Sequence, residues 1–128
     1  MKSLIALCLA CLPLRAEKLD FNRMVRVLSA LEGGKESDLG GPAHISYAAW
    51  SDHTRHAYQL SKTKEKAENI YRLHLAWIVN TLEGHGEPPS PHNLAVVWRR
   101  GMTEARSRKF RDEYGTRASN LYYDKTFK

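Results

Sequence analysis

The sequence predicts a single, mainly helical domain, on three grounds. Apolar residues recur at helical spacing in several separate stretches, and no convincing alternating pattern of a strand appears. A chain of 128 residues is long enough for one domain with one modest hydrophobic core. Any sheet would be very small and would lie in the glycine-containing loop between residues 35 and 45.

Residues 1–16 differ from the rest of the chain and resemble a secretory signal peptide. Lys2 gives a positive start, an apolar run follows from Leu4 to Leu14, and Ala16 supplies a small residue before the cut. The run is too short to span a bilayer as a helix, and a buried N-terminal helix is the alternative. We therefore expect an exported domain of residues 17–128, periplasmic or extracellular, without stable membrane insertion.

Cleavage after residue 16 would change the charge and the thiol content of the chain. It would remove Lys2 and Arg15, which leaves 18 basic and 14 acidic residues and a net charge of +4. It would also remove Cys8 and Cys11, so the mature domain would depend on its core and not on a disulfide. Cys11 is also a candidate for lipid anchoring, but Cys8 stands where such signals usually carry leucine.

The first helix of the domain is predicted between Asp20, a suitable N-cap, and Glu32. Gly33 and Gly34 follow Glu32 and end the helix in the usual way. A second helix is predicted to start at Ser46 and to end near residue 57. The apolar positions of the first helix are Met24, Val27, Leu28 and Leu31, and one face of the second carries Tyr47, Trp50 and Thr54.

The longest helical stretch runs from residue 64 to 82 and is predicted to be the central buried helix. Its apolar stripe consists of Ala67, Ile70, His74, Trp77 and Ile78. The segment from Gly84 to Pro89 combines glycine and proline and breaks this helix.

Two further helices complete the predicted domain. Ser90 is an N-cap followed by Pro91 at the first helical position, and this helix stops at Gly101. Asp112 is the N-cap of the last helix, in which Gly115 is an unfavourable helix former. The apolar residues of the last helix are Tyr114, Ala118, Leu121 and Tyr122.

The whole chain is basic, with a formal charge of +6 and a pI near 9.5. Such a balance favours anionic partners without choosing among them. The densest basic stretch lies between Trp98 and Phe110 and suggests nucleic-acid binding by phosphate contacts and stacking as a distant alternative. No known nucleic-acid-binding motif accompanies it, and we expect a solvated face instead. The basic residues are Arg99, Arg100, Arg106, Arg108, Lys109 and Arg111.

Glu32 is the residue with the clearest chemical potential. The negative end of a helix dipole and apolar neighbours both disfavour an ionised carboxylate, so a glutamate at this position tends to hold its proton. A protonated carboxyl group is what a general acid needs to protonate a glycosidic oxygen. The two glycines that follow lack bulk and would let a chain-like substrate come close. A solvated helix end is the alternative.

Three further stretches, in order after Glu32, resemble motifs of the lytic transglycosylase and goose-type lysozyme-like family, in a divergent bacterial form. The first is the glycine-rich segment Gly40 to Ser46, and the second runs from Asn93 to Gly101. The third is Tyr114 to Ala118 followed by Asn120 to Tyr122, so that the likeness covers about residues 21 to 123. Four positions depart from the family pattern: Gly33 for Ser, His44 for Gln, Trp98 for Tyr and Arg99 for Asn.

The resemblance implies a lysozyme-like fold that cleaves peptidoglycan between N-acetylmuramic acid and N-acetylglucosamine. Glu32 would be the catalytic acid and then the base that closes a 1,6-anhydro ring, and Tyr114 would hydrogen-bond and orient it. Since the substrate supplies the nucleophile, a lytic transglycosylase needs one carboxylate and no cofactor. The residues that would bind the glycan are His44, Ile45, Tyr47, Trp98, Arg99 and Gly101.

Two other readings stay open. A hydrolytic muramidase generally gains from a second carboxylate, for which Asp38 and Glu36 are the nearest candidates. A catalytically inactive domain that binds glycan is the other, supported by the departures at Gly33 and Arg99. We expect a monomer that binds peptidoglycan strands and no nucleic acid.

A metal site is not expected. His53 and His56 are three residues apart and permit a shared helix face, but no acidic or sulfur ligand accompanies them at a recognised spacing.

Overall fold

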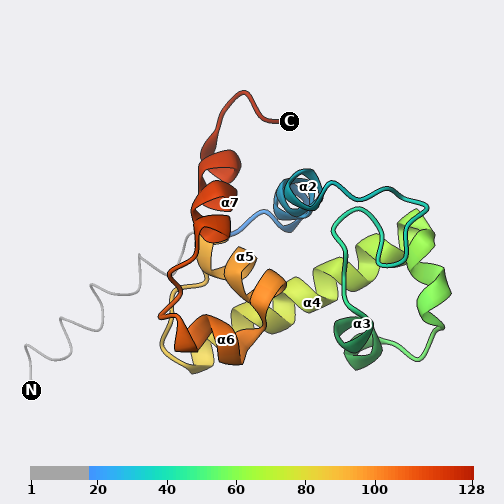
Figure 1. Cartoon of the computed structure of the whole chain (residues 1–128), viewed down its shortest axis with the longest axis horizontal. Helices are drawn as coiled ribbons and strands as arrows, with labels where there is room; N and C mark the ends of the chain where they lie inside the picture. Colours follow the sequence, from blue (N-terminus) through green and yellow to red (C-terminus); the bar gives the residue numbers. More distant parts are fainter. Residues whose placement is uncertain (1–17) are drawn as a thin grey trace, which may run out of the picture.

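A computed structural model of the chain describes residues 18–128 and is shown in Figure 1. The predicted signal peptide, with Cys8 and Cys11, lies outside the described residues. Within residues 18–128 the chain forms six α-helices, one short 3-10 helix and no strand, which confirms the mainly helical prediction. The elements are α2 (Phe21–Glu32), α3 (Tyr47–His53), η2 (Tyr58–Lys62), α4 (Lys64–Gly84), α5 (Pro91–Arg100), α6 (Met102–Ser107) and α7 (Glu113–Tyr123).

Four helices begin at the side chains that the sequence identifies as N-caps. In each case a side-chain oxygen accepts a hydrogen bond from a backbone N–H in the first turn, which satisfies one of the donors that a helix start leaves free. The pairs are Asp20 with Arg23 at 3.0 Å, Ser46 with Ala49 at 3.1 Å, Ser90 with Asn93 at 3.1 Å and Asp112 with Tyr114 at 2.8 Å.

The structure differs from the predicted elements in three places. α3 ends at His53 and not near residue 57, because Thr54 is extended and the indole N–H of Trp50 donates to the carbonyl of His56 at 2.8 Å. η2 and α6 were not predicted. α6 lies in the basic stretch, where Ala105 is its only buried residue, so its sequence carries almost no apolar period.

α4 is the centre of the structure. It contacts α2, α3, η2 and α5, and at 21 residues it spans roughly 30 Å, so that it runs along the long axis of the molecule in Figure 1. Trp77 departs from the predicted buried stripe because 46% of its surface is exposed. The buried residues of α4 are Ala67, Ile70, Tyr71, Leu75, Ile78 and Leu82.

α5 and α7 pack closely against each other, and Gly115 permits this contact. A Cβ atom at Gly115 would lie 2.6 Å from Val96 Cγ2 and 2.8 Å from His92 Cε1, closer than real contacts allow. The residue that is unfavourable for an isolated helix is therefore required by the helix pair. α7 also contacts α2, and a side chain in the first turn of α7, Tyr114, reaches Glu32 at the end of α2.

The loop between α2 and α3 folds back on the end of α2. Gly33 has a φ of 66° and caps α2, and the N–H of Gly34 donates to the carbonyl of Pro42 at 3.2 Å. A Cβ at Gly34 would lie 2.5 Å from the His44 ring, so the space beside Gly34 is filled by the protein itself. The expectation that both glycines open space for a substrate is therefore wrong for Gly34.

The hydroxyl of Tyr71 on α4 anchors the same loop. It donates to the carbonyl of Gly40 and accepts from the N–H of Ala43 at 3.3 Å. Burial raises the pKa of Tyr71 to about 12, so the hydroxyl keeps its proton at neutral pH. Ser61 of η2 adds a second anchor, because its Oγ accepts from the N–H of Gly40 at 2.6 Å.

Residues 122–127 are attached to α2 through Arg23. Its guanidinium donates to the carbonyls of Tyr122, Asp124 and Phe127 at 2.7, 2.7 and 2.8 Å. It also lies 5.7 Å from the ring centre of Tyr122 and 5.4 Å from that of Phe127. In the described part of the chain, no helix is long and apolar enough to cross a membrane.

We predict that Tyr71→Phe lowers the free energy of unfolding by about 1–3 kcal/mol, because it leaves the buried Gly40 carbonyl and Ala43 N–H without their partner. Urea unfolding followed by circular dichroism measures this difference. Tyr47→Phe is the control, because Tyr47 is 66% exposed. Equal stability of the two variants would show that the Tyr71 hydroxyl does not hold the loop.

Candidate active site

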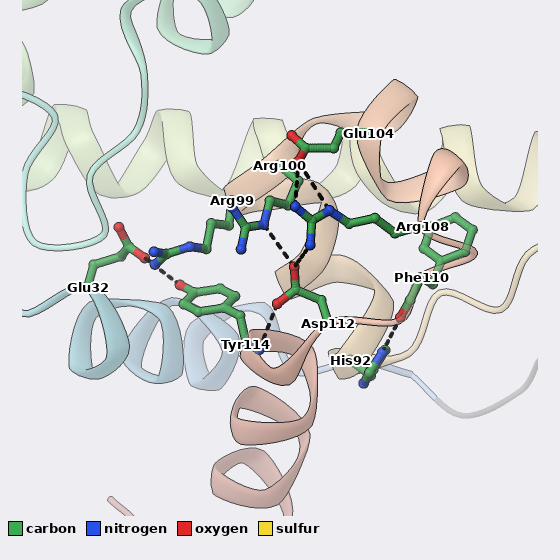
Figure 2. Close-up of polar contacts among 9 residues, drawn as sticks. All are labelled: Glu32, His92, Arg99, Arg100, Glu104, Arg108, Phe110, Asp112 and Tyr114. Carbon is green, nitrogen blue, oxygen red and sulfur yellow. Dashed lines mark hydrogen bonds and ion pairs between the residues drawn. The ribbon is translucent and has the colours of Figure 1, made fainter.

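Glu32 is the last residue of α2, and its carboxylate is directed toward α5 and α7 (Figure 2). Its side chain is 16% exposed. Oε2 accepts a hydrogen bond from the hydroxyl of Tyr114 at 2.7 Å and another from Nη1 of Arg99 at 3.3 Å. The structure thus brings Glu32 together with two residues that lie 67 and 82 positions away in the sequence.

Tyr114 is held rigidly in the first turn of α7. Its side chain is buried, and its backbone N–H donates to the capping carboxylate of Asp112. Burial raises the pKa of Tyr114 well above its usual value, and the hydrogen bond to Glu32 raises it further. The hydroxyl therefore remains a proton donor to Glu32 at any pH at which the protein would work.

Asp112 links the helices behind Tyr114. Its side chain is 5% exposed and accepts from Nε of Arg100 at 2.8 Å, and Nη1 of Arg108 lies 3.7 Å away. The hydrogen bond from Arg100 holds the pKa of Asp112 below its usual value. Arg108 also donates to Glu104 at 2.9 Å. As Figure 2 shows, this network joins α5, α6 and α7 and supports Tyr114 without touching Glu32.

Arg99 has a different environment from Arg100. Its side chain is 45% exposed, and its guanidinium carbon lies 4.8 Å from the ring centre of Tyr114. A guanidinium over an aromatic ring gains a cation–π attraction. Arg99 therefore stacks on the ring of Tyr114 and donates a hydrogen bond to Glu32.

A cleft of about 330 Å³ lies beside this group. Its walls come from α3, α4 and the junction of α5 with α6, and Arg99 connects it to Glu32. A larger hollow of about 700 Å³ is lined mainly by α2 and α4, and it contains neither Glu32 nor Arg99. Glu32 itself lines neither hollow, and we place the candidate site at the smaller cleft because Arg99, the ion-pair partner of Glu32, lines it. The cleft is lined by Ile45, Ser46, Ala49, Asp52, His74, Trp77 and residues 97–102.

Of the predicted glycan-binding residues, Ile45, Trp98, Arg99 and Gly101 line this cleft. Trp98 is also a structural residue, because its indole N–H donates to the carbonyl of Ala43 at 2.9 Å. Two predicted residues are not among those that line the cleft. Tyr47 is exposed and packs edge-on against Tyr58, and His44 is exposed beside Asp38.

The predicted second carboxylates do not line the cleft. Asp38 stays within its own loop, where it accepts from the N–H of Lys35 at 2.9 Å and lies 4.0 Å from His44 Nε2. Glu36 lines the larger hollow. Asp52 of α3 does line the cleft, and the sequence analysis missed it because no spacing in the sequence relates it to Glu32.

A histidine pair joins α3 to α4, and one of its members, His74, lines the cleft. His53 Nε2 and His74 Nδ1 are 2.9 Å apart, and one ring must donate to the other. The His74 ring stacks on Trp77, with an interplanar angle of 6°. His53 thus pairs across 21 positions with His74 and not with His56. Within residues 18–128, no group of three or more ligand side chains is arranged to hold a metal ion.

Both histidines of this pair favour the neutral state. Burial, with a smaller contribution from neighbouring His53, lowers the pKa of His74 from 6.5 to about 4, while Asp52 opposes the shift. Burial also lowers the pKa of His53. At neutral pH the pair is therefore uncharged and hydrogen-bonded, and His74 brings it to the cleft wall.

We predict that acidification destabilises the fold through His74. Between pH 6.5 and about 4 the unfolded chain binds a proton at this residue that the folded chain does not, so the free energy of unfolding falls as the pH falls. His74→Gln should make this fall smaller by on the order of 2 kcal/mol. Urea unfolding of both proteins at pH 7 and at about pH 4.5 provides the comparison, and parallel losses in the two would contradict the prediction.

The chain was also compared with known proteins. No protein-family model, no curated protein and no solved structure matches it.

Proposed function

We propose that this protein is a lysozyme-like enzyme that cleaves the glycan strands of peptidoglycan, with Glu32 as general acid and base. The observation that carries the proposal is the carboxylate of Glu32, 16% exposed, oriented by the Tyr114 hydroxyl at 2.7 Å and joined through Arg99 to a cleft. The motif order of the sequence adds support, because the family likeness independently implies the hydrogen bond between Tyr114 and Glu32. The bond cleaved would join N-acetylmuramic acid to N-acetylglucosamine.

A lytic transglycosylase is the form that the site favours. Glu32 would give its proton to the bridging oxygen as the bond from C1 of muramic acid to that oxygen breaks. The resulting carboxylate would then take the proton of the C6 hydroxyl, whose oxygen bonds to C1 and closes the 1,6-anhydro ring. One carboxylate serves both steps. This agrees with a site in which Tyr114 orients a single carboxylate, that of Glu32.

Tyr114 has a defined part in this scheme. Its hydroxyl fixes the orientation of Oε2, and this leaves the other carboxylate oxygen to meet the substrate. Since burial keeps Tyr114 protonated, it donates to Glu32 in both steps. It is therefore a positioning residue that does not exchange a proton with the glycan.

A hydrolytic muramidase is a second candidate, favoured by the position of Asp52. Asp52 lines the same cleft as Arg99 and comes from α3. In a hydrolase it would stabilise the sugar cation or direct water to C1. The products distinguish the two enzymes, because hydrolysis leaves a reducing end and transglycosylation leaves an anhydro end.

A domain that binds glycan without cleaving it is the third candidate. The ion pair between Arg99 and Glu32 favours it, since the guanidinium occupies the carboxylate that catalysis would need. In the catalytic proposal, Arg99 must leave Glu32 when substrate binds.

We predict that the purified protein converts peptidoglycan to anhydro-muropeptides and that Glu32→Gln abolishes this activity, because an amide neither donates nor accepts the required proton. Mass spectrometry of digested walls measures the products. Glu83→Gln is the control, because Glu83 is an exposed carboxylate at the end of α4 and does not line the cleft. Reducing-end products would assign the muramidase, and folded protein with no product on several wall types would refute catalysis.

We further predict that Tyr114→Phe lowers kcat by about tenfold or more with a smaller change in KM, because Glu32 loses the donor that orients it while the cleft keeps its shape. Initial rates on soluble glycan strands measure both constants. The thermal melting curve verifies that the variant is folded. An unchanged kcat in a folded variant would remove Tyr114 from the mechanism.

A further inference from the structure

Arg99 makes the longest hydrogen bond among the three arginines of this site, which are Arg99, Arg100 and Arg108. Its guanidinium has five N–H donors, and within residues 18–128 its one hydrogen bond goes to Glu32 at 3.3 Å. Arg23, in contrast, donates to three backbone carbonyls, and Arg100 binds Asp112 at 2.8 Å. Arg99 is held loosely by comparison and keeps most of its donors for another acceptor.

The surroundings of Arg99 present these donors to the cleft. Its side chain is 45% exposed, it lines the cleft, and the ring of Tyr114 supports its guanidinium at 4.8 Å. A guanidinium is a planar fork that matches a carboxylate with two parallel hydrogen bonds. Its present bond to Glu32 uses only Nη1, so a second carboxylate that offers a two-point contact would bind it better.

The substrate of the proposed function carries such a carboxylate on one of its two sugars. N-acetylmuramic acid bears a lactyl ether, whose acid group is free when the strand has no stem peptide and is an amide when a peptide is attached. A stem peptide brings carboxylates of its own, farther from the sugar ring. N-acetylglucosamine has no acidic group, so a chitin oligomer of the same length lacks this chemistry.

We propose that Arg99 recognises a carboxylate carried by the muramic acid residue and that this contact releases Glu32 for catalysis. The inference rests on the proposed function for its substrate, and it assigns Arg99 the choice between muramic acid strands and uncharged glycans. When the substrate carboxylate takes the guanidinium, Glu32 loses its ion-pair partner and the general acid is set free only on a correctly bound strand. Recognition and activation are thereby one event.

Binding to three soluble tetrasaccharides tests this proposal. The probes are a chitin tetramer, a peptide-free strand of alternating N-acetylglucosamine and N-acetylmuramic acid, and the same strand with its stem peptides. Calorimetry with the full chain carrying Glu32→Gln, which prevents turnover, gives the dissociation constants. We expect the strand with free lactyl groups to bind about tenfold or more tightly than the chitin tetramer, and this ratio to shrink as salt is added.

Three substitutions in the same background separate recognition from general effects. Arg99→Gln should reduce the preference to about twofold or less, and Arg99→Lys should retain part of it because it keeps the charge but loses the fork. Arg106→Gln removes an equal charge from α6, outside the cleft lining, and should leave the preference unchanged. Tightest binding of the peptide-bearing strand would identify the stem peptide as the source of the carboxylate.

The same experiment keeps this inference distinct from the function on which it rests. A preference for the acidic strands that Arg99→Gln abolishes supports the inference, even if the wild type yields no cleavage products. Equal binding of all three probes, or a preference that survives Arg99→Gln in a protein with an unchanged melting temperature, overturns it, even if the wild type cleaves walls through Glu32.

Discussion

Burial of α4 is the constraint on which the other elements depend. Four elements contact this helix, and its buried side chains include Leu75, Ile78 and Leu82, which are fully enclosed. Burying a side chain of this size stabilises a fold by about 1.5–3 kcal/mol, so these three alone contribute several kcal/mol. The same helix supplies Tyr71 to the loop that follows α2, and it supplies His74 and Trp77 to the cleft. The core and the candidate site thus share one element.

The site combines rigid support with one loosely held residue. Tyr114 is fixed by burial and by the cap of α7, and Asp112 is fixed by Arg100. Exposed ion pairs of the kind that Arg99 makes contribute little to stability, because solvent screens them and the long side chain loses entropy. The fold therefore loses little when Arg99 changes partner. This difference in rigidity is what separates the scaffold from the part that can respond to a ligand.

Helix starts were predictable from the sequence because their signal is local. Asp20, Ser46, Ser90 and Asp112 each cap a backbone N–H within three residues, and all four were identified. α6 was not predicted, because Ala105 is its only buried residue and its position depends on the turn that follows it. In that turn Lys109 and Phe110 adopt positive φ values of 55° and 57°, a conformation that neither residue type signals.

Contacts within the site between residues far apart in the sequence were predictable only from the family likeness. Glu32 and Tyr114 are 82 residues apart, and the motif order paired them before any geometry was available. Arg99 was assigned to glycan contacts, and its bond to Glu32 was not foreseen. The pairing of His53 with His74 was missed for a related reason. Helical spacing relates residues three or four positions apart, and these two meet through the packing of α3 on α4.

The attachment of Arg23 to residues 122–127 has a consequence for the order of folding. Its three carbonyl partners are 99 to 104 positions away, so α2 completes its environment only after residue 127 has been synthesised. Contacts between residues so far apart in the sequence form slowly, because closing the long loop between them costs entropy before the contacts can stabilise the fold. α2 can pack on α4 before then, but Glu32 meets Tyr114 only after residue 114 has been synthesised, and Arg23 meets its carbonyl partners later still. The carboxylate therefore acquires the tyrosine that orients it only after the residues of α2 to α6 have all been made.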